Sequence, residues 1–255
     1  MKVSIIAMLC AGTMATVAQA DIYQWDWSAD ADGTSGLNMR GGEFQSVFAQ
    51  FDSDTNRFLW QTTFADQITD GYSLAVNNGP NPKGHAGELA LIYFDATGSD
   101  VRVTGYAYNG INSLNSYRDG SPVGGTQAPD MIFGSNGLEN ASFITTASVV
   151  DNFDGTRVMT LEMDASLINT HSPAYPGPGG QEEWTGLAFA EKLGLWMHPF
   201  DNLETSYDDD GALDGWSGRQ GWFDGGGYDT TTVPAPGALA LMGIGGVLAG
   251  RRRRS

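Results

Sequence analysis

Hydrophobic and polar residues alternate along much of the chain between residues 21 and 200, with the period of two that is typical of half-buried β-strands. Residues 57–64 are the clearest case, since Phe, Trp, Thr and Phe share one face while Leu, Gln and Thr share the other. Residues 101–108 alternate in the same way, and residues 88–94 are nearly all apolar, as expected of a strand covered on both faces. The pattern therefore predicts antiparallel β-structure with little helix.

Short polar segments between these strands predict hairpin turns. Residues 52–56 read Asp-Ser-Asp-Thr-Asn and follow a predicted strand at residues 46–51, and residues 151–155 form a similar turn. One helical turn is expected over residues 164–169, capped by the side chain of Asp164. The remaining strands that the pattern predicts are residues 142–150, 156–163, 184–190 and 193–198.

Together these elements indicate one all-β domain. At least eight strands, 35 glycines and polar turns are typical of a single antiparallel β-sandwich, which we expect to be jelly-roll-like and to occupy residues 21–200. Residues 201–232 are acidic and rich in glycine, and they predict a partly ordered linker after this domain.

Residues 1–20 have the three parts of a secretory signal peptide. Lys2 provides the charged start, residues 3–17 are mostly apolar, and residues 18–20 read Ala-Gln-Ala, the pattern that signal peptidase cleaves. The mature protein would therefore be exported and would begin at Asp21. The single cysteine, Cys10, would be removed, which excludes disulfides, thiolate metal sites and a cysteine nucleophile from the mature chain.

Residues 233–255 combine a proline motif, an apolar run and a basic end. The residues of the motif and of the basic end are Pro234, Ala235, Pro236, Arg251, Arg252, Arg253 and Arg254. As a helix, the apolar run at residues 237–250 would be about 21 Å long, shorter than the roughly 30 Å hydrocarbon core, so we expect a marginal anchor. The arginines would hold their end in the cytoplasm. A soluble apolar helix with a basic end is the alternative.

This tail resembles the bacterial PEP-CTERM sorting signal, in which a proline-containing motif precedes an apolar helix and a terminal arginine cluster. The family motif is usually Pro-Glu-Pro, whereas this chain has Ala235 between its two prolines. The resemblance is limited to residues 233–255. It implies transient anchoring in the inner membrane, processing by an exosortase-type enzyme, and delivery of the body to the cell surface or the extracellular matrix.

The chain is strongly acidic, with a formal net charge of −17. Without Lys2 and the four terminal arginines, 8 basic residues remain against 30 acidic ones, so the processed body would carry −22. Such a surface repels phosphate groups, and we therefore exclude nucleic acid as a partner. The acidity either keeps a secreted protein soluble or attracts cations.

Two acidic clusters resemble fragments of calcium loops, in which oxygen ligands recur along the chain. The candidate calcium ligands are Asp52, Asp54 and Asn56 in one cluster and Asp208, Asp210 and Asp214 in the other. Neither loop is complete, because Arg57 and Ser217 stand where a loop glycine and a bidentate glutamate are expected. Asp and Asn are also common in tight turns, so each cluster predicts either a calcium site or an ordinary turn.

Two tryptophans near the end of the body are the candidate ligand-binding residues. Trp216 and Trp222 lie among Gly, Asp and Arg219, a setting that is difficult to place inside a core. A flat aromatic ring beside polar acceptors suits stacking on a sugar ring, as in a non-catalytic carbohydrate-binding sandwich. Packing within the domain or the linker is the alternative, because large rings usually fill cores.

Catalytic motifs are weak by comparison. Glu182 and Glu183 are adjacent and would point to opposite faces of a strand, which is unsuitable for a glycosidase pair. The sequence contains neither a His-Glu-x-x-His zinc motif nor a Gly-x-Ser-x-Gly elbow. We therefore expect an exported binding or structural protein that is associated with extracellular polysaccharide. The alternative is a secreted glycan hydrolase whose carboxylates meet only in the folded chain.

Overall fold

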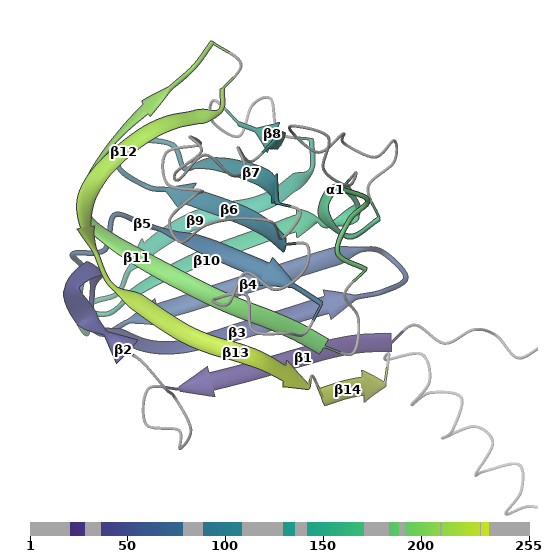
Figure 1. The fold of residues 1–255 in the computed structure, drawn as a ribbon. Helices are drawn as coiled ribbons and strands as arrows, with labels where there is room; N and C mark the ends of the chain where they lie inside the picture. The colour runs from purple at the N-terminus through teal and green to yellow at the C-terminus, as the bar shows by residue number, and fades with distance from the viewer. Residues whose placement is uncertain are drawn as a thin grey trace, which may run out of the picture.

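The computed structural model describes residues 21–28, 37–78, 89–108, 130–135, 142–170, 184–188, 192–209, 211–229 and 231–234. The predicted signal peptide, and the apolar run and arginines of the predicted tail, lie outside these residues. Within them, no helix is long and apolar enough to cross a membrane. The described chain forms two antiparallel β-sheets with very little helix (Figure 1).

One sheet has six strands in the order β14-β1-β3-β4-β10-β9, and every neighbouring pair is antiparallel. The turns predicted at residues 52–56 and 151–155 connect the hairpins β3–β4 and β9–β10. The strands of this sheet are β1 (Asp21–Ser28), β3 (Phe44–Asp52), β4 (Arg57–Phe64), β9 (Ile144–Asp151), β10 (Arg157–Asp164) and β14 (Thr231–Pro234).

The other sheet has eight strands, in the order β2-β13-β11-β5-β6-β7-β8 with β12 paired to β11. Its strands are β2 (Leu37–Asn38), β5 (Gly71–Asn77), β6 (Leu89–Asp95), β7 (Arg102–Tyr108), β8 (Asp130–Gly134), β11 (Lys192–Tyr207), β12 (Leu213–Gln220) and β13 (Trp222–Asp229), and the short 3-10 helix η1 (Met39–Gly41) follows β2. Strand β11 lies beside β5, so β11-β5-β6-β7 has Greek-key order. A jelly roll contains two Greek keys. The antiparallel all-β fold is therefore confirmed, whereas its jelly-roll detail stays a prediction.

The two sheets share a hydrophobic core, as expected for a β-sandwich-like fold (Figure 1). The alternation along β4 places Phe58, Trp60 and Phe64 in this core, each with 0% exposure. Leu74 of β5 enters the same core from the other sheet and is also fully buried. Trp60 stacks on Trp25 of β1 with ring centroids 6.1 Å apart. The predicted period of two along β4 is thus confirmed by its burial.

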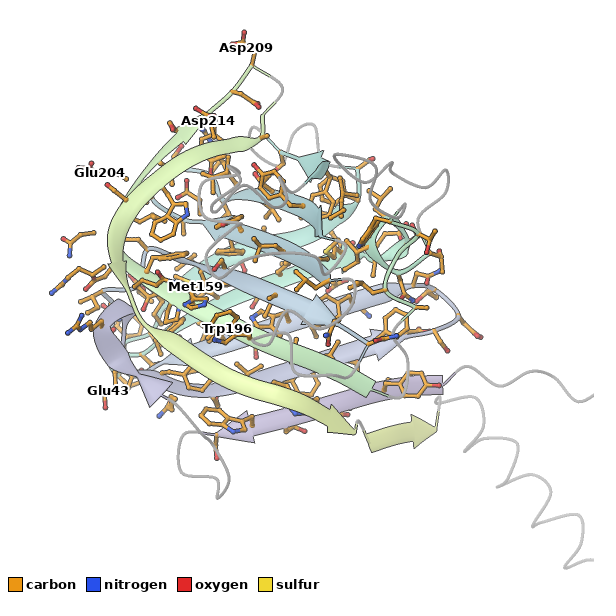
Figure 2. The ribbon with its side chains drawn as sticks, in the orientation of Figure 1. Glu43, Met159, Trp196, Glu204, Asp209 and Asp214 are labelled. Carbon is orange, nitrogen blue, oxygen red and sulfur yellow. The ribbon has the colours of Figure 1, made fainter. Side chains whose placement is uncertain are left out.

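A second hydrophobic cluster lies on the outer face of the eight-stranded sheet, and its buried members are Ala75, Leu89, Leu91, Tyr93, Tyr106, Phe200 and Leu213. Strand β11 has an irregularity between Asp201 and Glu204, and it bends so that its distal half and β12 arch beside this sheet (Figure 1). Trp196 of β11, which is labelled in Figure 2, also packs against the cluster. Because both faces are covered, every residue of β5 and β6 is buried. For β6, the apolar run at residues 88–94 predicted this burial.

Most of the described residues between 201 and 232, for which the sequence predicted a linker, belong instead to the sheets. Strand β11 continues to Tyr207, and β12, β13 and β14 follow it. Strands β12 and β13 pair with β11, and β14 pairs with β1 so that Pro234 lies opposite Asp21. These strands are rich in glycine and acidic residues and therefore lack the apolar alternation by which strands are predicted from sequence. They form nonetheless, because main-chain hydrogen bonds to a neighbouring strand require no apolar side chains. The boundary expected at residue 200 therefore falls inside a strand.

The strand predicted at residues 184–190 is not formed where the structure describes this segment. Trp184 makes an isolated bridge, and residues 185–188 have no regular structure, with Ala188 at a φ of 49°. The N–H groups of Leu187 and Ala188 donate to the main-chain oxygens of Ile168 and Asn169. The apolar pattern was correct for burial, because Trp184 and Leu187 are buried. The main chain of Leu187 and Ala188, however, is hydrogen-bonded to residues 168 and 169 and does not form a strand.

The predicted helical turn after Asp164 is confirmed as α1 (Ser166–Asn169). Asp164 Oδ1 accepts a hydrogen bond from the Ser166 N–H at 2.9 Å. The cap position itself is occupied by Ala165, so the carboxylate acts from one residue further back. This turn follows β10 directly and begins at the end of the six-stranded sheet where β4 starts.

Candidate functional site

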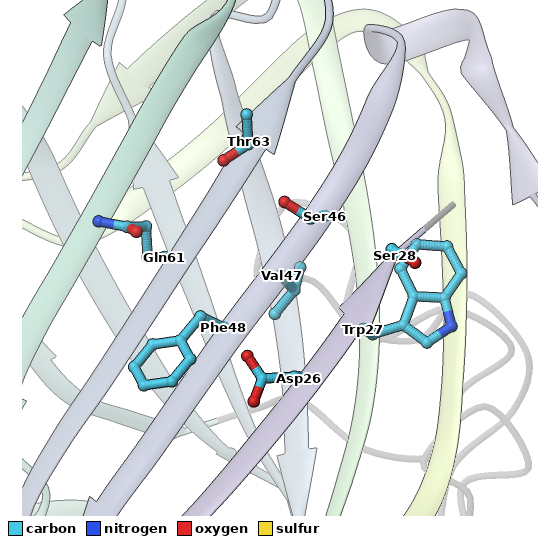
Figure 3. A pocket seen from close by; sticks show the side chains of 8 residues that line it. All are labelled: Asp26, Trp27, Ser28, Ser46, Val47, Phe48, Gln61 and Thr63. Atoms are coloured by element: carbon cyan, nitrogen blue, oxygen red, sulfur yellow. The ribbon is translucent and has the colours of Figure 1, made fainter. Parts of the chain in front are cut away.

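A groove of about 370 Å³ lies over β1, β3 and β4 on the outer face of the six-stranded sheet (Figure 3). The outward side chains that line it are Asp26, Ser28, Ser46, Phe48, Gln61 and Thr63. Trp27 and Val47 also line it, but their side chains are buried in the core, so their main chain forms the floor. The groove is thus built directly on paired strands, which hold its side chains in fixed positions.

Strand register arranges the lining residues in two rows across the sheet. Asp26 lies opposite Phe48, which lies opposite Gln61. The second row, two residues further along each strand, is Ser28, Ser46 and Thr63. Because side chains alternate along a strand, positions two apart point to the same face, and neighbouring strands are about 4.8 Å apart. The rows therefore run side by side on the outer face.

The hollow follows from the sizes of the two rows. Phe48 and Gln61 are large and half-buried, whereas Ser28, Ser46 and Thr63 are small. The small row leaves space beside the large row, and the Phe48 ring borders that space from β3 (Figure 3). An aromatic ring next to hydroxyl groups provides an apolar surface and hydrogen-bonding groups within one ligand's reach.

Two hydrogen bonds fix the polar side chains at the ends of the larger row. Gln24 Nε2 donates to Asp26 Oδ2 at 3.1 Å, and Gln61 Nε2 donates to Thr160 Oγ1 at 3.1 Å. Asp26 is exposed, so its carboxylate is available to accept further hydrogen bonds from a ligand. Among the described residues that line the groove, Asp26 is the one carboxylate, and none is basic.

Both arginines on the strands of this sheet form ion pairs with carboxylates. Arg57 Nε lies 2.6 Å from Glu162 Oε1, and Arg157 Nε lies 2.6 Å from Asp151 Oδ1. The hydrogen bond from Arg57 lowers the pKa of Glu162 below its ordinary value, and the hydrogen bond from Arg157 lowers the pKa of Asp151 in the same way. The positive charges on the strands of this sheet are therefore already compensated.

A second polar cavity of about 230 Å³ lies between the β6–β7 turn and the distal half of β11. It is lined by Asp95, Thr97, Gly98, Ser99, Asp100, Arg102 and Thr205. Asp95 is only 4% exposed, and its carboxylate accepts hydrogen bonds from the Thr97 N–H, the Thr97 and Thr205 hydroxyls and the Tyr207 hydroxyl, at 2.7–2.9 Å. Burial and the nearby Asp95 raise the pKa of Tyr207. We interpret this cavity as a structural tie between β6 and β11.

The first predicted calcium cluster lies in the β3–β4 turn. Asp52 Oδ1 accepts hydrogen bonds from the N–H groups of Asp54 and Thr55 at 3.0 and 3.3 Å. Asn56 has a φ of 53°, in the left-handed region that asparagine tolerates in tight turns. The structure therefore brings the three predicted residues together as a turn, and calcium binding there stays a prediction.

The second predicted cluster lies in the β11–β12 turn. Asp208 Oδ1 accepts a hydrogen bond from the Ala212 N–H at 2.8 Å and so closes the turn. Asp214 is exposed on β12, near the tip of the hairpin that carries Asp209 (Figure 2), and Asp210 lies outside the described residues. In the part of the chain that is described, no group of three or more His, Cys, Asp or Glu side chains is arranged to hold a metal ion.

The predicted sugar-stacking tryptophans have different positions. Trp216 on β12 is half-buried, and its ring lies 4.6 Å from the Phe200 ring within the second hydrophobic cluster. Trp216 therefore packs within the domain, which is the alternative that the sequence left open. Trp222 begins β13, and its side chain is outside the description. Glu182 and Glu183, and all of the predicted sorting motif except Pro234, also lie outside the described residues.

The groove residues form a site that the sequence pattern did not predict. One signal was present, because Gln61 and Thr63 were predicted to share the face of β4 that is opposite to its aromatic residues. Their proximity to Asp26 and Phe48 depends on the pairing of three strands, and pairing cannot be deduced from alternation within one strand.

Comparison with known proteins found no matching family model, no matching curated protein and no matching solved structure. The function proposed for the chain therefore depends on the chemistry of its own residues. Of the two cavities described above, the groove on the six-stranded sheet is the larger, and the half-buried ring of Phe48 borders it. A concave site with apolar surface and a few convergent polar groups is the expected form of a ligand site.

Proposed function

We propose that this chain is an exported, non-catalytic binding protein that attaches to extracellular polysaccharide through the groove on its six-stranded sheet. The observation that carries the proposal is the row Asp26, Phe48 and Gln61 beside the hydroxyls of Ser28, Ser46 and Thr63. A sugar ring has apolar C–H faces and hydroxyl groups around its edge. The Phe48 ring can pack against the C–H face of the sugar, and the carboxylate, amide and hydroxyl groups of the groove can form hydrogen bonds with its hydroxyl groups.

The chemistry of the groove favours binding over hydrolysis. Glycoside hydrolysis ordinarily uses two carboxyl groups, separated by about 5–9.5 Å across the bond that is cleaved. Of the described lining residues, Asp26 alone carries a carboxyl group. The second carboxylate that a hydrolase would use is thus not supplied by this set of residues, and the groove is better suited to holding a glycan.

The predicted ends of the chain support a location outside the cell. The signal peptide at residues 1–20 would direct export, and the PEP-CTERM-like tail at residues 233–255 would provide transient anchoring before an exosortase-type enzyme acts. In this proposal the two sheets form the part that is delivered to the surface. The groove would then retain the protein within the polysaccharide matrix.

Substitution of Phe48 tests the proposed site. We expect Phe48→Ala to weaken retention on insoluble polysaccharide about tenfold, because loss of an aromatic contact of about 1–1.5 kcal/mol changes affinity by that factor. The measurement is co-sedimentation of the purified protein with a panel of insoluble cellulose, chitin, α-glucan and mannan, together with an assay for released reducing ends.

Phe153→Ala is the matched control, because Phe153 is an exposed phenylalanine in the β9–β10 turn and is not one of the residues that line the groove. It should retain full binding. Release of reducing ends would support the hydrolase alternative. Failure of the unsubstituted protein to bind any member of the panel would contradict the proposed function.

A further inference from the structure

Building on the proposed function, we propose that the groove selects uncharged glycans and rejects glycans that carry carboxylate, sulfate or phosphate groups, with Asp26 as the specificity-determining residue. The proposal concerns the chemical class of the ligand at the same site. It depends on where the charges of the six-stranded sheet lie and on which of them are already paired.

The charge inside the groove is negative. Asp26 is exposed at one end of the larger row, and the other described lining residues are neutral. A sugar held against Phe48 places its substituents within a few ångströms of Asp26, because Phe48 and Asp26 are register partners on adjacent strands. An uncharged hydroxyl can donate a hydrogen bond to this carboxylate, whereas a ligand anion at the same distance is repelled.

The neighbouring cations are not available to compensate an anionic ligand. Arg57 and Arg157 are the basic residues on the described strands of this sheet, and each is engaged by a carboxylate on an adjacent strand at 2.6 Å. Arg157 also donates to the main-chain oxygen of Thr69 at 2.6 Å. Recognition of carboxylates, sulfates and phosphates ordinarily depends on arginine or lysine donors, and the described lining provides none.

The charge of the whole chain acts in the same direction over a longer distance. A formal net charge of −17 repels polyanions during approach. Salt screens this long-range repulsion, because the Debye length is about 10 Å at 0.1 M. Asp26 repels an anionic group of a ligand that is bound in the groove, and salt screens this short-range repulsion less. The long-range and short-range contributions to the repulsion can therefore be separated by varying the salt concentration and by substituting Asp26.

The experiment compares neutral and anionic polymers that share a backbone. The purified full chain is run in affinity gels that contain hydroxyethylcellulose or carboxymethylcellulose, dextran or dextran sulfate, and pullulan or carboxymethylpullulan, at low and at high salt. At least one neutral polymer should retard the protein, and its anionic counterpart should bind at least about tenfold more weakly at low salt. The difference in affinity between the neutral and the anionic polymer should become smaller at high salt but should not disappear.

Asp26→Asn should lower the neutral-to-anionic affinity ratio several-fold. Asp209→Asn is the charge-matched control, because Asp209 is exposed in the β11–β12 turn, and its ratio should equal that of the unsubstituted protein. Equal or tighter binding of the anionic polymers would overturn this inference while leaving the proposed function intact. An unchanged ratio in Asp26→Asn would also overturn it. If none of the six polymers, neutral or anionic, retards the protein, the result contradicts the proposed function itself.

Discussion

Asp95 is a buried carboxylate whose hydrogen bonds join parts of the chain that are far apart in sequence. Its two oxygens accept from Thr97 in the turn after β6 and from Thr205 and Tyr207 on the distal half of β11. A buried charge is tolerated when each of its acceptor positions is used. The Tyr207 ring also supports Arg102, whose guanidinium carbon lies 4.5 Å from the ring centroid. Asp95 therefore positions the bend of β11.

We expect Asp95→Ala to reduce the free energy of unfolding by about 3 kcal/mol, because three hydroxyl groups and one N–H group lose their buried acceptor in a partly buried region. Urea denaturation followed by tryptophan fluorescence measures the effect. Asp100→Ala is the control, since Asp100 lines the same cavity but is exposed, and it should change stability by less than about 0.5 kcal/mol. Equal effects of the two substitutions would contradict the structural role of Asp95.

Single strands of this fold are predictable from sequence, and their pairing is not. The alternation in residues 57–64 gave both the bounds and the buried face of β4, because one side of the strand meets a core. β12 and β13 escaped prediction, since their glycines and acids carry no apolar pattern and their order comes from main-chain bonds to β11. The same limit applies to the prediction of the groove. Gln61 and Thr63 were placed together on one face of β4, but which residues of β1 and β3 lie beside them depends on the pairing register of the three strands.

The β9–β10 hairpin contains an ion pair whose effect on stability depends on pH. The hydrogen bond from Arg157 lowers the pKa of Asp151 below its ordinary value of 3.8. Because the pKa is lower in the folded state, the stabilisation is present above about pH 4 and is lost as pH falls through the folded-state pKa. The Asp151 side chain is 45% exposed, so the pair contributes about 1 kcal/mol or less.

Asp151→Asn should therefore destabilise the protein slightly at neutral pH and have no effect once the carboxyl group is protonated. The measurement is the difference in unfolding free energy between the variant and the unsubstituted protein, at neutral pH and at a pH well below 4. A difference that persists unchanged in acid would show that the effect of the substitution does not come from the charge of Asp151.

At the scale of the whole molecule, the segment after residue 200 holds both sheets together. Strand β14 covers the free side of β1 in the six-stranded sheet, while β13 and β12 pair with β11 in the eight-stranded sheet. Leu213 of β12 enters the second hydrophobic cluster, and its main-chain oxygen accepts a hydrogen bond from the Tyr106 hydroxyl. The acidic, glycine-rich composition that suggested a linker therefore belongs to a segment with structural contacts in both sheets.

Truncation distinguishes these two interpretations of residues 201–234. A chain that ends after residue 200 would lose distal β11, β12, β13 and β14, and it would expose the cluster around Tyr106 and Phe200 to water. We expect this chain to lack a cooperative thermal transition, whereas a chain that ends after Pro234 keeps every described strand and should melt in one transition like the full chain. Circular dichroism and differential scanning calorimetry measure both. A cooperative transition of the shorter chain at the same temperature would mean that residues 201–234 do not contribute to the sheets, and the linker interpretation would then be correct.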